Sequence, residues 1–170
     1  IIKNGEIVIN AGKIAYVGTA TPRTVPVDAI IIDAAGKHVS PGIIDAHSHI
    51  ATDGGVNEGG QAITCEVRIG DFIDSTNINI YRQLAAGVTT SNILHGSANA
   101  IGGQNQVIKL RWGAMPEELK FAGAKPGVKF ALGENPKQSN WGDRFNSRYP
   151  QTRMGVEQIS KEYNAGNLVR

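Results

Sequence analysis

Two histidines two residues apart are the strongest candidates for chemistry in this sequence. His47 and His49 follow a short apolar run, and in a β-strand the side chains of residues i and i+2 point to the same side. Two neutral imidazoles in that arrangement can share one metal ion, typically zinc, and leave a coordination position open for water. The alternative is that both histidines are ordinary polar residues on the solvated face of an edge strand.

The residues in front of the pair favour a strand that ends at a site. Pro and Gly at 41–42 predict a turn, and the two isoleucines at 43–44 predict a buried start of the strand. Asp45 adds a carboxylate, which we expect either to orient the metal-binding histidines or to bond neighbouring backbone groups. The single cysteine, Cys65, excludes an internal disulfide and a cysteine-based zinc cluster, so a metal site must use imidazole and carboxylate groups.

The rest of the chain reads as strands followed by alternating helices and strands. Short strands are predicted at 6–10, 13–17, 29–33 and 38–39. A helix with its N-cap at Ser75 should end at Gly87, and a strand over 88–94 then requires a parallel crossover. The later predictions are a polar loop at 95–106, a short strand or hairpin arm at 107–111, a strand at 129–132 and a weak helix at 157–169.

Several of these segments resemble one known family. Pro-Gly-Ile-Ile-Asp-Ala-His-Ser-His at 41–49 resembles the first barrel strand of the amidohydrolase superfamily, which are metal-dependent hydrolases built on a distorted (β/α)8 barrel. Gly-Lys-Ile-Ala-Tyr-Val-Gly at 12–18 is similar to a hairpin in the small sandwich domain that precedes that barrel. Ala-Gly-Val-Thr-Thr at 86–90 resembles the helix end and second strand, and the segments at 102–110, 133–137 and 152–155 resemble the imidazolonepropionase-like branch.

The resemblance implies an α/β fold in two parts. Residues 1–40 would be part of an N-terminal β-sandwich domain, and residues 41–170 would be the N-terminal half of a TIM-like (β/α)8 barrel. A complete barrel takes about 250 residues, only about half as many follow Ile43, and the chain opens without Met. We therefore expect a fragment of a longer enzyme, whereas the alternative is a complete small domain of unusual topology.

The position of residues along the barrel strands ranks the other site candidates, because active sites lie at the C-terminal ends of these strands. Glu134 would close the strand at 129–132 and Lys129 begins it, so we prefer Glu134 to the lysine that some amidohydrolases carboxylate. Glu134 is expected as a metal ligand or a substrate contact, although a Glu before Asn-Pro can equally cap a turn. His95 is expected to bind substrate or polarise a carbonyl; the alternative is a loop histidine bonded to backbone. Gln104 offers an amide that could orient a substrate.

Cationic and aromatic residues alternate in the last third of the chain. They are Lys125, Lys129, Lys137, Arg144, Arg148 and Arg153, with Trp141, Phe145 and Tyr149 between them. A solvated loop with snorkelling cations explains this pattern. The alternative is a lid whose guanidinium groups clamp an anionic substrate, with Arg153 as the substrate-binding candidate.

Composition and charge narrow the function classes. Hydrophobic residues at 41% and charged residues at 19% indicate a globular protein, and a net charge of +2 argues against a nucleic-acid partner. No apolar stretch approaches the ~20 residues of a membrane-spanning helix. The sequence leaves the compartment open.

The resemblance implies a hydrolase of C–N bonds in amides or cyclic amides, with a small-molecule substrate and one or two divalent metal ions, zinc being the first choice. The family's catalytic aspartate and later histidines are expected outside this chain, so we expect residues 1–170 alone to be inactive. An open half barrel would also self-associate, because it leaves sheet edges and apolar faces uncovered. The alternatives are a non-catalytic amidohydrolase-like scaffold and a small α/β binding module.

Overall fold

The computed structural model describes residues 1–58, 61–137 and 153–166. The chain divides into two compact units, Ile1–Ser40 and Pro41–Arg170. Within the described ranges, no helix is both long enough and apolar enough to cross a membrane.

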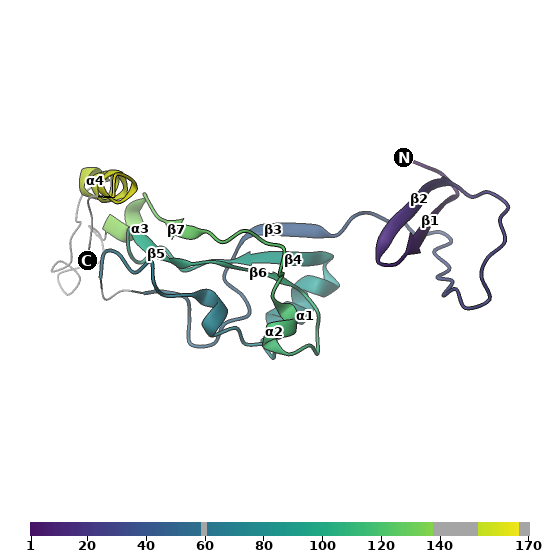
Figure 1. Cartoon of the computed structure of the whole chain (residues 1–170), viewed down its shortest axis with the longest axis horizontal. Helices are drawn as coiled ribbons and strands as arrows, with labels where there is room; N and C mark the ends of the chain where they lie inside the picture. Colours follow the sequence, from purple (N-terminus) through teal and green to yellow (C-terminus); the bar gives the residue numbers. More distant parts are fainter. Residues whose placement is uncertain (59–60, 138–152, 167–170) are drawn as a thin grey trace. The chain divides into compact units, whose positions relative to one another are not determined.

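The first unit contains one antiparallel hairpin, formed by β1 (Gly5–Asn10) and β2 (Lys13–Thr19) (Figure 1). The turn between them has positive φ at Ala11 (47°) and Gly12 (72°), which suits a two-residue hairpin connection. These two strands confirm the predictions for 6–10 and 13–17.

The strands predicted at 29–33 and 38–39 are absent, so that prediction was wrong. Ile30 and Ile32 are 91% and 84% exposed and pair with no strand in the described residues. Branched side chains raise strand propensity, but a strand also needs a neighbour, and here β1 and β2 pair only with each other.

The second unit begins with a strand, a helix and a parallel strand. β3 (Ile43–Ser48) pairs in parallel with β4 (Val88–Ile93), and α1 (Ile78–Ala85) connects them. This arrangement confirms the predicted crossover. The helix is capped by Asn77, whose side chain accepts a hydrogen bond from the backbone N–H of Asn79, and not by Ser75 as the sequence suggested.

Two further strand pairs extend from this crossover. β6 (Gln106–Lys109) pairs antiparallel with β4 and gives the sheet order β3-β4-β6, while β5 (Ile101–Gln104) pairs antiparallel with β7 (Val128–Phe130). β5 leads into β6 with one residue between them (Figure 1). The predicted loop at 95–106 therefore contains a strand, which its two glycines concealed from the propensity argument.

The remaining elements are short apart from the last helix. They are the 3₁₀ turn η1 (Ile69–Asp71), α2 (Pro116–Leu119), α3 (Glu134–Lys137) and α4 (Arg153–Asn164) (Figure 1). The mixed α/β class is confirmed. A (β/α)8 barrel consists of parallel strands. Among the named strands of the second unit, β3 and β4 pair in parallel, whereas the pairs β4–β6 and β5–β7 are antiparallel, so the partial barrel remains a proposal.

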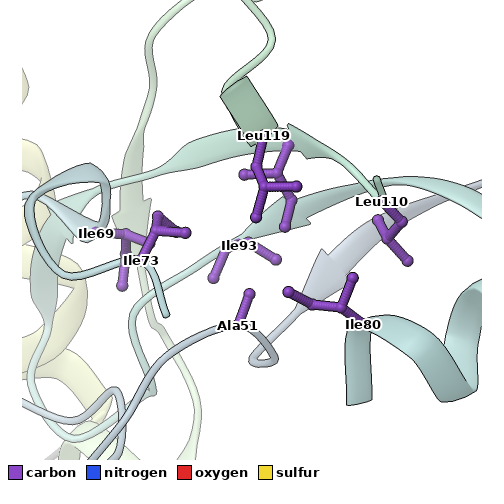
Figure 2. Packing of buried hydrophobic residues seen from close by; sticks show 8 residues of the cluster. Ala51, Ile69, Ile73, Ile80, Ile93, Leu110 and Leu119 are labelled. Atoms are coloured by element: carbon purple, nitrogen blue, oxygen red, sulfur yellow. The ribbon is translucent and has the colours of Figure 1, made fainter. Parts of the chain in front are cut away.

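The main core of the second unit lies between α1, β4, β6 and the connections around them. Figure 2 shows apolar side chains gathered around Ile93 of β4, and the fully or nearly buried members are Ala51, Ile69, Ile73, Ile80, Ile93, Ile108, Leu110 and Leu119. Ile43 and Ile44 were expected to be buried but are 57% and 71% exposed, so neither face of β3 is covered where the strand begins.

Candidate metal centre

His47 and His49 converge on one point at the C-terminal end of β3. Their Nε2 atoms are 3.1 Å apart, and their rings meet nearly at right angles, with centroids 5.0 Å apart and an interplanar angle of 86°. Both side chains are exposed. Asp45 accepts a hydrogen bond from the backbone N–H of His47 at 3.1 Å, so of its two predicted roles the structure shows the bond to neighbouring backbone.

A backbone contact determines which nitrogen of His49 is available. Nδ1 of His49 lies 2.8 Å from the carbonyl oxygen of Leu94, and a carbonyl can only accept, so Nδ1 carries the hydrogen. The lone pair of Nε2 then faces His47. The backbone N–H of Leu94 donates to the carbonyl of Ser48 at 2.9 Å, so the ends of β3 and β4 are tied together at this point.

The spacing of the two nitrogens fits a shared metal ion. Two nitrogens bound to one zinc at about 2.0–2.1 Å with a near-tetrahedral angle lie about 3.3 Å apart, close to the 3.1 Å between these Nε2 atoms. Within residues 1–58, 61–137 and 153–166, no group of three or more His, Cys, Asp or Glu is arranged to hold a metal. Two imidazoles alone would bind weakly, so another donor is needed.

Lys129 is the candidate for this donor, because its side chain reaches the histidine pair. It is half-buried in the middle of β7, and its Nζ lies 3.5 Å from Nε2 of His47 and donates to the carbonyl of His95 at 3.3 Å. Burial lowers the pKa of the Lys129 ammonium from its usual value. The sequence signal for Lys129 was a single charged residue between apolar neighbours in a predicted strand. From the sequence alone, Lys129 nevertheless ranked below Glu134.

The electrostatics around His47 favour the neutral imidazole that a metal requires. Burial lowers the pKa of His47, and the charges of Lys129 and His49 lower it further, whereas Asp45 raises it. Protonation therefore competes with metal binding less than it would at an ordinary histidine.

His95 is buried just beyond β4, with 2% of its surface exposed. Neither ring nitrogen makes a hydrogen bond of good geometry within the described part of the chain, although backbone groups of Val56 and Val67 lie close enough to interact with the ring. Burial lowers its pKa most; the backbone groups of Val56 and Val67 and the carboxylate of Glu58 raise it, and Lys129 lowers it. Contact between this ring and a substrate, as predicted from its place after the strand, would require the ring to be uncovered.

The other predicted site residues lie elsewhere. Glu134 begins α3 and is exposed, because β7 ends at Phe130 and not at 132. Gln104 is half-buried at the end of β5 and donates to the carbonyl of Cys65 at 3.1 Å. Arg153 is the first residue of α4, and its side chain and the predicted lid over 138–152 lie outside the described residues.

Gln104 also lines a pocket of about 270 Å³ together with Arg68, Asn105, Lys120 and Lys125. His47 and His49 are not among its lining residues. The amide of Asn105 is engaged inside the protein, because its Nδ2 donates to Oδ1 of Asn92 at 2.6 Å.

Comparison with known proteins shows the relationship of this chain. No family model matches the sequence. The amidohydrolase tasK of Hapsidospora irregularis is 36% identical over 169 aligned residues, which cover 89% of this chain and 17% of the relative. The crystal structure of an amidohydrolase from Thermotoga maritima MSB8 superimposes with a TM-score of 0.79 at 36% identity, covering 94% of this chain and 42% of that one.

The chain belongs to the amidohydrolase superfamily. Imidazolonepropionase from Staphylococcus aureus (strain Newman) is a second kind of relative, 48% identical over 58 residues that cover 34% of this chain and 13% of the enzyme. The chain thus spans less than half the length of each of these amidohydrolase relatives. The resemblance seen in the sequence is confirmed at the level of the superfamily, and hydrolase activity is a property of the family.

Proposed function

We propose that this chain is part of a metal-dependent hydrolase that cleaves C–N bonds in amides or cyclic amides. The observation that carries the proposal is the pair of Nε2 atoms of His47 and His49, 3.1 Å apart at the end of β3. A bound divalent ion, with zinc as the first choice, would lower the pKa of a water molecule toward neutrality and polarise the scissile carbonyl. The imidazolonepropionase relative supports a cyclic amide as substrate.

Within this site, His47 and His49 hold the metal through Nε2, and Lys129 supplies the next ligand. An ammonium group has no lone pair, so Lys129 can ligate only as the free amine or after reaction of that amine with carbon dioxide. In that reaction a C–N bond forms as one C=O π bond of carbon dioxide opens onto oxygen, the nitrogen loses one proton, and the resulting carbamate offers oxygen donors. The distance of 3.5 Å between Nζ and His47 supports this assignment. It replaces our preference for Glu134, which begins α3 beyond the end of β7.

Substrate contacts are assigned less directly. Gln104 and Arg153 remain predictions as substrate-binding residues, and Glu134 remains one as a substrate contact. The catalytic aspartate and further histidines that the family resemblance implies are expected outside residues 1–170, so this segment alone should show no turnover.

Metal content tests the proposal directly. The purified chain, loaded with Zn²⁺ and passed through a desalting column, should retain metal, and His47→Ala and His49→Ala should each reduce the retained metal at least tenfold. His38→Ala is the matched control, because it removes an exposed histidine of the first unit. Equal metal content in His47→Ala and His38→Ala would refute the assignment.

We also expect the isolated chain to self-associate. Ile44 on the edge strand β3 is 71% exposed, and Ile30 and Ile32 in the first unit are 91% and 84% exposed. Exposed apolar side chains and an unpaired strand edge favour association. Light scattering after size exclusion should give a mass above the 18.1 kDa of one chain, and a monomer at micromolar concentration would contradict this expectation.

A further inference from the structure

His95 is the one imidazole of the second unit that the proposed metal site does not use as a ligand. Its ring is enclosed on three sides. Phe72 lies edge-on at 6.2 Å between centroids, Gly103 of β5 lies against the Nε2 side of the ring, and the carbonyl of Val67 is beside Nε2. A buried polar ring without a well-formed hydrogen bond is costly, so its place in the fold calls for an explanation.

The strand beneath the ring leaves room for nothing larger than glycine. A Cβ atom on Gly103 would lie 2.2 Å from Nε2 of His95 and 2.2 Å from the Val67 carbonyl oxygen. That carbonyl is itself fixed, because it accepts a hydrogen bond from the backbone N–H of Gln104 at 2.7 Å. The ring of His95 therefore packs tightly against the backbone of Gly103 and Val67, which cannot move independently of β5; we call this contact the wedge.

The main chain at His95 carries the contacts that matter for the metal site. The carbonyl of Leu94 accepts the hydrogen bond from Nδ1 of His49 at 2.8 Å, and the next carbonyl, that of His95, accepts from Nζ of Lys129 at 3.3 Å. Two consecutive peptide oxygens thus hold two of the proposed ligands. Rotation of either peptide plane would release His49, Lys129 or both.

We propose that the wedged ring of His95 is a positioning residue, which fixes the peptide oxygens of Leu94 and His95 so that His49 and Lys129 face the metal. This inference rests on the proposed function and adds to it: the ring acts through backbone and touches neither metal nor substrate. Groups that orient metal ligands change metal affinity by about 10–100-fold when they are removed.

The first test needs no metal. In the metal-free chain, ¹⁵N NMR of the imidazoles should show neutral His49 as the Nδ1–H tautomer. His95→Ala should mix the tautomers of His49, whereas His95→Phe, which refills the space of the ring without ring nitrogens, should preserve the Nδ1–H tautomer. An unchanged His49 signal in His95→Ala would overturn the proposal, as would equal loss in His95→Ala and His95→Phe while the circular dichroism stays native.

The second test uses Co²⁺ titration followed by visible absorption. Co²⁺ affinity should fall about 10–100-fold in His95→Ala, stay within about threefold in His95→Phe and His38→Ala, and vanish in His47→Ala. Unchanged affinity in His95→Ala would overturn the positioning role and leave the metal site intact. If the unaltered chain binds no Co²⁺, the proposed function fails, and the tautomer of His49 still decides the role of His95. If His95→Ala does not fold, the His49 signal of His95→Phe decides it: a retained tautomer supports the wedge and a lost one overturns it.

Discussion

Substituting Gly103 by Ala tests the packing beneath His95 in a way that can be worked out from distances. The added Cβ would lie 2.2 Å from the Nε2 atom of His95 and 2.2 Å from the carbonyl oxygen of Val67, so each atom must retreat by more than 1 Å to reach ordinary contact. One neighbour is backbone and the other is a buried ring, so neither can move away without disturbing its surroundings.

The cost follows from two physical terms. Overpacking a filled interior costs about 1–3 kcal/mol, and displacing Val67 weakens its hydrogen bond with the backbone N–H of Gln104, worth about 1 kcal/mol. The free energy of unfolding should therefore fall by about 2–4 kcal/mol. At about 3 °C of melting temperature per kcal/mol for a unit of this size, that is about 6–12 °C.

Thermal unfolding followed by circular dichroism measures this difference, and Gly133→Ala is the matched control. A Cβ on Gly133 would have no atom within 4 Å, and its φ is not in the left-handed region. The control should therefore unfold within about 0.5 kcal/mol of the unaltered chain or be slightly more stable. If Gly103→Ala and Gly133→Ala melt at the same temperature, the ring of His95 does not fill the space next to Gly103.

Three other outcomes follow from the fold. Ile93→Ala removes the centre of the main core and should lower the free energy of unfolding by about 2–5 kcal/mol in urea titrations; a loss below 1 kcal/mol would place that core elsewhere. Asn77→Ala removes the cap of α1 and should cost about 1 kcal/mol, while a neutral effect would mean that the cap makes no net contribution. The pKa of His95 is lowered in the folded chain, with Glu58 opposing and Lys129 adding to the effect of burial, so the unfolded chain binds more protons below pH 6.5. Its contribution to stability is complete above that pH and is lost as the pH falls through the folded pKa, so His95→Phe should flatten the slope of stability against pH below 6.5.

The sequence predicted best where local signals and tertiary packing agree. The first hairpin has a turn with positive φ at Ala11 and Gly12, and the strand–helix–strand crossover has a Gly at position 87 with φ of 96° directly after the helix. Both were predicted within two or three residues. The strands at 29–33 and 38–39 failed because strand propensity says nothing about whether a partner strand exists in the same unit.

Lys129 and Glu134, the two candidates for a further metal ligand, show how a small error in the bounds of a strand changes the ranking of site residues. The strand was predicted to run to 132, which placed Lys129 at its start and Glu134 just beyond its end. In the structure β7 is Val128–Phe130, so Lys129 is central to it and Glu134 belongs to the next helix. Element bounds are the least certain part of a prediction from one sequence, and the ranking of ligands depended on them.

The contacts that arrange the proposed ligands explain why sequence reasoning could identify the histidine pair and not its support. His47 and His49 are recognisable because the side chains themselves are the ligands. Their support comes from peptide oxygens at the end of β4, and any residue type carries a peptide oxygen, so the identity of Leu94 conveys nothing about its hydrogen bond with His49. The sequence indicates such a site only indirectly, through the residues that we propose fix the peptide. These are the buried His95 after the strand and the glycine pair Gly102 and Gly103 that packs against it. We therefore expect a buried histidine without a well-formed hydrogen bond, packed against a glycine that admits no Cβ, to indicate that the backbone beside it must keep one conformation.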